Sequence, residues 1–277
     1  MLLRLAFTLS VSALLATAAS AQVVRFETTM GSFDMVLNAT NDPRLQGHVD
    51  NLLDYVEADR YRGSWINRAA EGFVLQMGGF YSHTKRPPRT IESTQNLAAF
   101  NPVTGSPGIS GLSNTVGTVS MALPGDGMGG TNRNGGTSSF FINLTSNTFL
   151  DADFTVFAAI TDLTVINNIM GLMQVDRTTD PVFGAGAGNL AFSDVPLMDD
   201  GKQVFVLRTF VIDDTLAVAR ARAAVGATMA ASASAAGSGG LSSAGLAGAI
   251  AVPEPTSLAA LLIGLASAAF LPRRSRR

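Results

Sequence analysis

Between residues 22 and 214, apolar residues occur in short runs separated by glycine and small polar residues. The runs span residues 24–28, 33–37, 72–76, 117–122, 138–144, 154–160 and 204–212. Apolar residues recur at every second position in the first two runs, and Met30-Gly31-Ser32 between them is typical of a hairpin turn. This pattern predicts many short β-strands joined by tight turns.

Two segments show the spacing of an amphipathic helix instead. Their apolar residues are Val49, Leu52, Leu53 and Val56, and Ile166, Ile169, Met170 and Met173. Many short strands, glycine-rich joints and only two helices favour a mainly β fold. We therefore expect a closed antiparallel β-barrel capped by two α-helices, rather than a parallel sheet with crossover helices.

The first 21 residues predict a secretory signal peptide. Arg4 precedes an apolar stretch that runs to about Ala18, and Ala19-Ser20-Ala21 is a small-x-small cleavage site. A buried N-terminal helix is the alternative, but it would leave Arg4 and the cleavage site unexplained. We expect cleavage after Ala21 and a folded domain over residues 22–214.

The chain ends in two segments of different composition. Residues 215–251 contain 26 Ala, Gly or Ser among 37 residues, which predicts a flexible linker, although its first part could form a frayed helix. In residues 252–277, Pro253-Glu254-Pro255 precedes a 16-residue apolar run and four arginines. This order resembles the PEP-CTERM sorting signal of Gram-negative bacteria, which implies an exosortase-type processing enzyme as a partner. A plain C-terminal membrane anchor with its arginines in the cytoplasm is the alternative.

Charge and composition exclude several functions for the domain. There is no cysteine, so disulfides, thiolate metal sites and thiol nucleophiles are ruled out. Residues 22–214 carry 12 Lys and Arg against 20 Asp and Glu, a net charge of −8. Nucleic-acid binding is therefore not expected, because it needs clustered basic residues.

Three groups of motifs carry a family resemblance. They are YRGSWINR (61–68) with GFVLQMGGF (72–80), SNTVGTVSMA (113–122), and TSSFFIN (137–143) followed by FLD (149–151) and FTVF (154–157). In this order and spacing, they resemble a cyclophilin-type peptidyl-prolyl cis-trans isomerase over essentially residues 24–212. The resemblance implies an eight-stranded antiparallel barrel closed by two helices, in agreement with the pattern above.

The resemblance also implies site residues. The family's catalytic arginine and glutamine fall on Arg68 and Gln76. The substrate-binding residues fall on Phe73, Val74, Met121, Ala122, Leu123, Phe141, Phe149, Leu150 and Phe154. Phe140 is expected in the core, because neighbouring strand residues point to opposite faces. No cofactor or metal is implied.

The chain departs from the pattern of many relatives at five positions around the site. These are Asn67, Glu71, Ser139, Phe149 and Phe154. They bear on substrate preference and cyclosporin sensitivity more than on the reaction. We expect an exported, monomeric isomerase acting on proline-containing polypeptides in the periplasm, at the outer surface or in the extracellular matrix, anchored at least transiently in the inner membrane. A Pro-peptide binding module without turnover and a structural envelope component are the alternatives.

Overall fold

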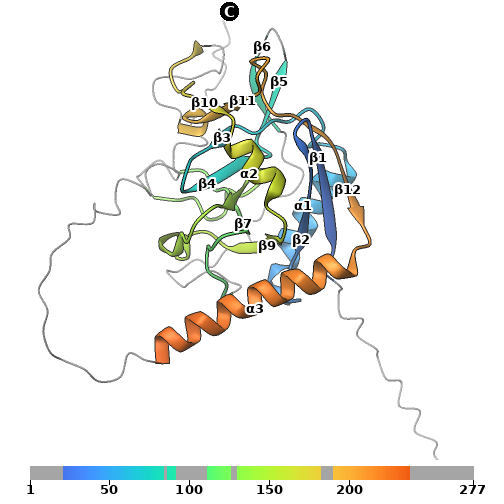
Figure 1. Ribbon diagram of the computed structural model, residues 1–277, viewed down its shortest axis with the longest axis vertical. Coiled ribbons are helices and arrows are strands. Elements are labelled where there is room, and N and C mark those ends of the chain that lie inside the picture. The colour runs from blue at the N-terminus through green and yellow to red at the C-terminus, as the bar shows by residue number, and fades with distance from the viewer. Residues whose placement is uncertain (1–20, 84–85, 92–110, 126–129, 182–189, 238–277) are drawn as a thin grey trace, which may run out of the picture.

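The computed structural model describes residues 21–83, 86–91, 111–125, 130–181 and 190–237 (Figure 1). Its centre is an eight-stranded antiparallel sheet in the order β12-β1-β2-β9-β7-β8-β4-β3. These strands are β1 (Val23–Thr28), β2 (Gly31–Leu37), β3 (Arg68–Ala69), β4 (Val74–Met77), β7 (Thr118–Met121), β8 (Phe140–Asn143), β9 (Val156–Ile160) and β12 (Val206–Ile212). Two small two-stranded sheets pair β5 (Phe80–His83) with β6 (Arg86–Thr90) and β10 (Met173–Val175) with β11 (Val195–Leu197).

Both helices expected within the domain are present as α1 (Gln46–Glu57) and α2 (Thr164–Met170), but α2 ends before Met173, which begins β10 and is exposed. The seven predicted strand segments correspond to β1, β2, β4, β7, β8, β9 and β12. Thr28 and Gly31 are register partners at the end of the β1–β2 hairpin, and the Gly31 φ of 118° suits glycine at this turn. The mainly β character of the fold is therefore confirmed.

The sheet is curled but it is not the closed barrel that the sequence predicts. No ladder joins its edge strands β12 and β3 among the described residues. Residues 63–66, just before β3, instead make three backbone hydrogen bonds across the gap, between Gly63 and Val206, Val206 and Ser64, and Ile66 and Val204, at 2.8–3.0 Å. A ladder needs a continuous extended run, and β3 has only two residues, so closure is local and irregular.

The inner face of the curled sheet forms the main core. Alternation along β1 and β2 directs Val24, Phe26, Phe33 and Met35 into it. Phe140 joins this core as expected, with its ring centroid 5.6 Å from that of Phe26. Helix α1 contributes a row of buried residues from one side, and α2 adds Ile166 and Ile169.

A third helix, α3 (Thr215–Gly237), follows β12 directly and crosses the sheet near β1, β2 and β9 (Figure 1). Its buried residues are Ala217, Val218, Ala221 and Val225. They pack in one cluster with Val23, Val36, Val156 and Ala159 from the outer face of the sheet. The expected flexible linker therefore begins as a docked helix, because the outer sheet face is itself apolar and needs a cover.

Residues 1–20 and 238–277, which hold most of the expected signal peptide and the whole sorting segment, lie outside the described residues. Ala21, the expected last residue of the signal peptide, is buried in the cluster beneath α3. Within the described ranges, none of the helices combines the length and apolar character that a membrane crossing requires.

Candidate active site

Arg68, Gln76 and Phe141 lie side by side on three neighbouring strands. Gln76 of β4 is the register partner of Arg68 in β3 and of Phe141 in β8. Directly opposite residues in an antiparallel sheet direct their side chains to the same face. The structure therefore brings together the predicted arginine, glutamine and one wall of the predicted proline pocket.

Aromatic rings extend this row on both sides. The guanidinium carbon of Arg68 lies 5.6 Å from the ring centroid of Phe73, and Phe73 stacks on Phe149 at 6.1 Å. Phe141 makes an edge-to-face contact with Phe154 at 5.5 Å. The site thus consists of a cation and an amide bordered by aromatic walls.

All predicted apolar site residues except Phe149 belong to one core cluster. Its members from the prediction are Phe73, Val74, Met121, Ala122, Leu123, Phe141, Leu150 and Phe154. Phe149 differs, because it lies in a 3-10 turn (Thr148–Leu150) and 46% of it is exposed. Phe149 therefore lies at the surface, where its ring covers that of Phe73.

Arg68 is held by two residues that the sequence analysis missed. Its Nε donates to the Ser193 hydroxyl at 3.0 Å and lies 3.4 Å from an oxygen of Asp194. Only 2% of Arg68 is exposed. Burial lowers the pKa of its guanidinium, and the charge of Asp194 opposes that change. No motif marks Ser193 or Asp194, which lie about 125 residues away along the chain.

Gln76 is only partly satisfied by the protein. Its Nε2 lies 3.5 Å from the Ser139 hydroxyl, a long hydrogen bond. Its buried Oε1 has no hydrogen-bond partner among the described residues. A buried acceptor without a partner is costly, so an N–H from a bound peptide is a fitting partner for this oxygen.

Three buried asparagines support the aromatic walls from behind. Asn147 Nδ2 donates to the Phe73 carbonyl at 3.0 Å and to Asn143 Oδ1 at 2.9 Å. Asn143 Nδ2 in turn donates to Asn114 Oδ1 at 3.1 Å, and Asn114 Nδ2 donates to the Phe154 carbonyl at 3.1 Å. Because each amide bonds the next, this network fixes the loops that carry Phe73 and Phe154.

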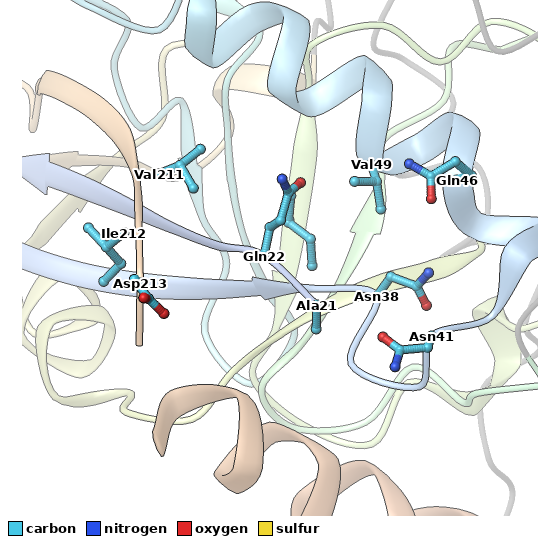
Figure 2. A pocket seen from close by; sticks show the side chains of 10 residues that line it. Ala21, Gln22, Asn38, Asn41, Gln46, Val49, Val211, Ile212 and Asp213 are labelled. Atoms are coloured by element: carbon cyan, nitrogen blue, oxygen red, sulfur yellow. The ribbon is translucent and has the colours of Figure 1, made fainter. Parts of the chain in front are cut away.

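A cavity of about 460 Å³ lies elsewhere, at the start of β1 and the end of β12 (Figure 2). It is lined by Ala21, Gln22, Leu37, Asn38, Asn41, Gln46, Val49, Val211, Ile212 and Asp213, none of them a predicted site residue.

In the part of the chain that the structure describes, no group of three or more His, Asp or Glu side chains is placed to hold a metal ion. The predicted site itself offers a guanidinium, an amide and apolar rings.

Comparison with known proteins decides the family. The sequence profile of the family described as "Cyclophilin type peptidyl-prolyl cis-trans isomerase/CLD" matches residues 23–183. The chain belongs to the cyclophilin family.

Two bacterial proteins illustrate how far the similarity of this cyclophilin extends. It is 33% identical over 128 residues to peptidyl-prolyl cis-trans isomerase A of Dickeya dadantii and spans 57% of that protein's length. It is 30% identical over 182 residues to a peptidyl-prolyl cis-trans isomerase of Acinetobacter baylyi, which is 64% of this chain and 82% of that one. A crystal structure of a Cryptosporidium parvum cyclophilin type peptidyl-prolyl cis-trans isomerase superimposes with a TM-score of 0.47 at 15% identity, over 70% of this chain and 99% of that one.

The structure also shows the surroundings of the five departures from the family pattern. Asn67, which stands where many relatives have histidine, is buried and donates to the Ala191 carbonyl at 2.9 Å. Ser139 bonds the Met77 carbonyl at 3.3 Å. Glu71 is exposed, whereas Phe154 packs on Phe141. Phe149 stacks on Phe73. In this cyclophilin, therefore, four of these five side chains have packing or hydrogen-bonding contacts of their own.

Proposed function

We propose that this cyclophilin isomerises Xaa-Pro bonds of exported or surface proteins and thereby assists their folding. One observation carries the proposal: Arg68 lies in register with Gln76 and Phe141, and its guanidinium rests against Phe73. Family membership supports the same reaction.

The mechanism follows from the electronic structure of the amide. Resonance gives the peptide C–N bond a rotation barrier of roughly 18–20 kcal/mol, and at the transition state the prolyl nitrogen lone pair is no longer shared with the carbonyl. A guanidinium N–H from Arg68 donates to that lone pair and stabilises the twisted amide more than either planar isomer. Arginine suits this role because its side chain stays charged at ordinary pH.

Binding and orientation are assigned to the remaining residues. Phe73, Phe141 and Leu150 form apolar walls for the proline ring. Gln76 holds a neighbouring peptide group through its amide, and Met121–Leu123 lies along the peptide backbone. No residue needs to act as a nucleophile or general base in this scheme.

The proposal extends to location. The signal-like residues 1–21 and the PEP-CTERM-like residues 252–277 support export followed by processing by an exosortase-type enzyme. Fractionation of cells that make the full chain or a version ending at Ala251 tests this part. The full chain should remain in membranes until it is processed, whereas the shorter version should be soluble in the periplasm. Equal solubility would remove the role assigned to the tail.

One observation favours a second candidate function. Arg68 and Gln76 are retained, but Asn67, Ser139 and Phe154 around them differ from the residues of many relatives. A module that binds Pro-containing peptides without turnover fits a site with its apolar walls kept and its surroundings altered. This alternative predicts peptide binding without isomerisation.

A coupled assay on a Xaa-Pro peptide separates the two candidates. Full-length protein, purified in mild detergent, is assayed for cis-trans isomerisation and, in parallel, for binding of the same peptide by calorimetry. Accelerated isomerisation supports the enzyme. Binding with an unchanged isomerisation rate supports the binding module. If the protein neither binds nor isomerises the peptide, both candidate functions are excluded.

A further inference from the structure

We propose that Ser193 and Asp194 are positioning residues that hold Arg68 by its Nε and leave its two terminal nitrogens for the prolyl amide. This inference rests on the proposed isomerase function. Both residues lie beyond residues 23–183, where the family profile matches. They would thus belong to the active site although the family profile does not extend to them.

Strand β3 cannot hold Arg68 firmly by itself. It has two residues and pairs with β4 on one edge only. On its other edge, Ala69 N donates to the Asp194 carbonyl at 2.7 Å, and Asn67 Nδ2 donates to the Ala191 carbonyl at 2.9 Å. Residues 191–194 thus take the place of a neighbouring strand on both sides of Arg68.

The side chains of Ser193 and Asp194 also hold the guanidinium in place. Nε of Arg68 donates to Ser193 Oγ at 3.0 Å, and the Ser193 hydroxyl donates to the Asp194 carboxylate. Among the described residues, no hydrogen bond is found from either terminal nitrogen of Arg68. One edge of the planar group is therefore fixed and the other is available, which is the arrangement a positioned donor needs.

Charge contributes to the same arrangement. The side chain of Arg68 is 2% exposed, whereas that of Asp194 is 36% exposed. A buried cation is costly without a counter-charge. Asp194 supplies that charge from the solvent side without occupying the face of Arg68 that contacts Phe73.

The segment that carries these residues is anchored by Phe192. Its ring stacks on Trp65 at 5.7 Å and contacts Phe80 at 4.9 Å. Its carbonyl accepts from the backbone N–H of Arg177 at 2.8 Å. Directly after Asp194, β11 pairs with β10. Contacts on both sides make Ser193 and Asp194 a rigid support rather than a loose loop.

Kinetics of full-length Ser193→Ala, Asp194→Asn and Asp194→Ala test the proposal. We expect Asp194→Ala to lower kcat/KM about tenfold through kcat, because a small misplacement of a catalytic group can cost up to about 10²-fold. Asp194→Asn should lower kcat/KM less than Asp194→Ala does, because an amide oxygen can still accept the hydrogen bond from the Ser193 hydroxyl. KM should change less than about twofold. Asp200→Asn, which removes an exposed carboxylate paired with Lys202, should match the parent.

A double-variant cycle distinguishes positioning from general stability. In an Arg68→Ala background, Asp194→Ala should cause no further loss, because the group that it positions is gone. A further loss of about tenfold in that background would overturn the proposal, as would parental kcat/KM in Asp194→Ala.

A second measurement does not depend on turnover. In the parent, the Nε–H resonance of Arg68, identified by its disappearance in Arg68→Lys, should exchange slowly with solvent. Ser193→Ala and Asp194→Ala should accelerate that exchange, whereas equal exchange rates would overturn the proposal. If the parent shows slow exchange that these variants lose but no isomerisation, the positioning role stands and the proposed function fails.

Discussion

Gln76 lies directly opposite Arg68 in the antiparallel pairing of β3 with β4. The pair places a charged donor beside a neutral amide whose buried oxygen has no partner among the described residues. The arginine can therefore act on the prolyl nitrogen while the amide binds the adjoining peptide group. This division of roles predicts that substitution of Arg68 lowers turnover more than peptide binding, whereas substitution of Gln76 weakens peptide binding as well.

The first prediction concerns Arg68. Arg68→Ala should lower kcat/KM by about 10²–10³, the range for loss of one preorganised electrostatic donor. Binding of a Pro-containing peptide should weaken far less, because Phe73 and Phe141 still form walls. Arg68→Lys should restore only part of the activity, since an ammonium lacks the planar fork. Isomerisation kinetics and calorimetry on the same peptide measure both effects.

The control for this prediction is Arg208→Ala, which removes an exposed arginine paired with Glu27. It should retain parental kinetics. Circular dichroism and thermal melting must show that each variant is folded. Parental turnover in a folded Arg68→Ala would show that the catalytic assignment is wrong.

The second prediction concerns the asparagine network. Asn147→Ala removes the donor to the Phe73 carbonyl and to Asn143 and leaves both acceptors buried. We expect a loss of stability of about 1–3 kcal/mol. Because Phe73 is no longer fixed, KM for a Xaa-Pro peptide should rise more than kcat falls. Urea unfolding and steady-state kinetics check the two effects.

Asn132→Ala is a suitable comparison, because Asn132 is an exposed asparagine in the loop before β8. It should change the unfolding free energy by less than about 0.5 kcal/mol. If Asn147→Ala is as stable as Asn132→Ala and has the same KM, the network does not support the pocket.

The sequence predicted the parts of the fold that depend on local pattern. Alternation placed β1 and β2, and helical spacing placed α1 and α2. The predicted barrel closure was wrong, because closure depends on how far a two-residue strand can pair, which periodicity does not encode. Arg68 and Gln76 were placed together by the family motifs, whereas Ser193 and Asp194 approach only through tertiary contacts.

The sequence of the strands contains a signal for the docking of α3. Val23-Val24 and Met35-Val36-Leu37 are consecutive apolar residues in strands, so both faces of β1 and β2 must be covered. The Ala-rich composition concealed the matching helix, because small residues form a buried stripe with little contrast to the exposed face. Only packing against Val36 and Val156 distinguishes the buried face of α3 from its exposed face.

The third prediction tests this docking. Ala221 is completely buried in α3, whereas Ala219, half a turn away, is exposed. Ala221→Asp should lower the unfolding free energy by about 3 kcal/mol or more, because it buries a charge without a partner. Ala219→Asp, the matched control, should change it by less than about 1 kcal/mol. Chemical denaturation of both proteins is the measurement, and equal stabilities would mean that α3 does not pack on the sheet in solution.

The last prediction concerns the pH dependence of stability. His48 is fully buried in α1, and its ring stacks on Phe157 at 5.6 Å. Burial lowers the pKa of His48 from 6.5 to about 4. The unfolded chain therefore binds a proton at higher pH than the folded protein does. The free energy of unfolding is therefore highest above pH 6.5. Between pH 6.5 and about 4 it falls by about 1.4 kcal/mol per pH unit, because only the unfolded chain is protonated at His48 in this range. His48→Gln, which has no titrating side chain, should flatten this slope, while carboxylates such as Asp42 contribute equally to both proteins. Urea unfolding at pH 7, 6, 5 and 4.5 measures the difference, and parallel profiles for the two proteins would show that His48 is not held neutral in the folded state.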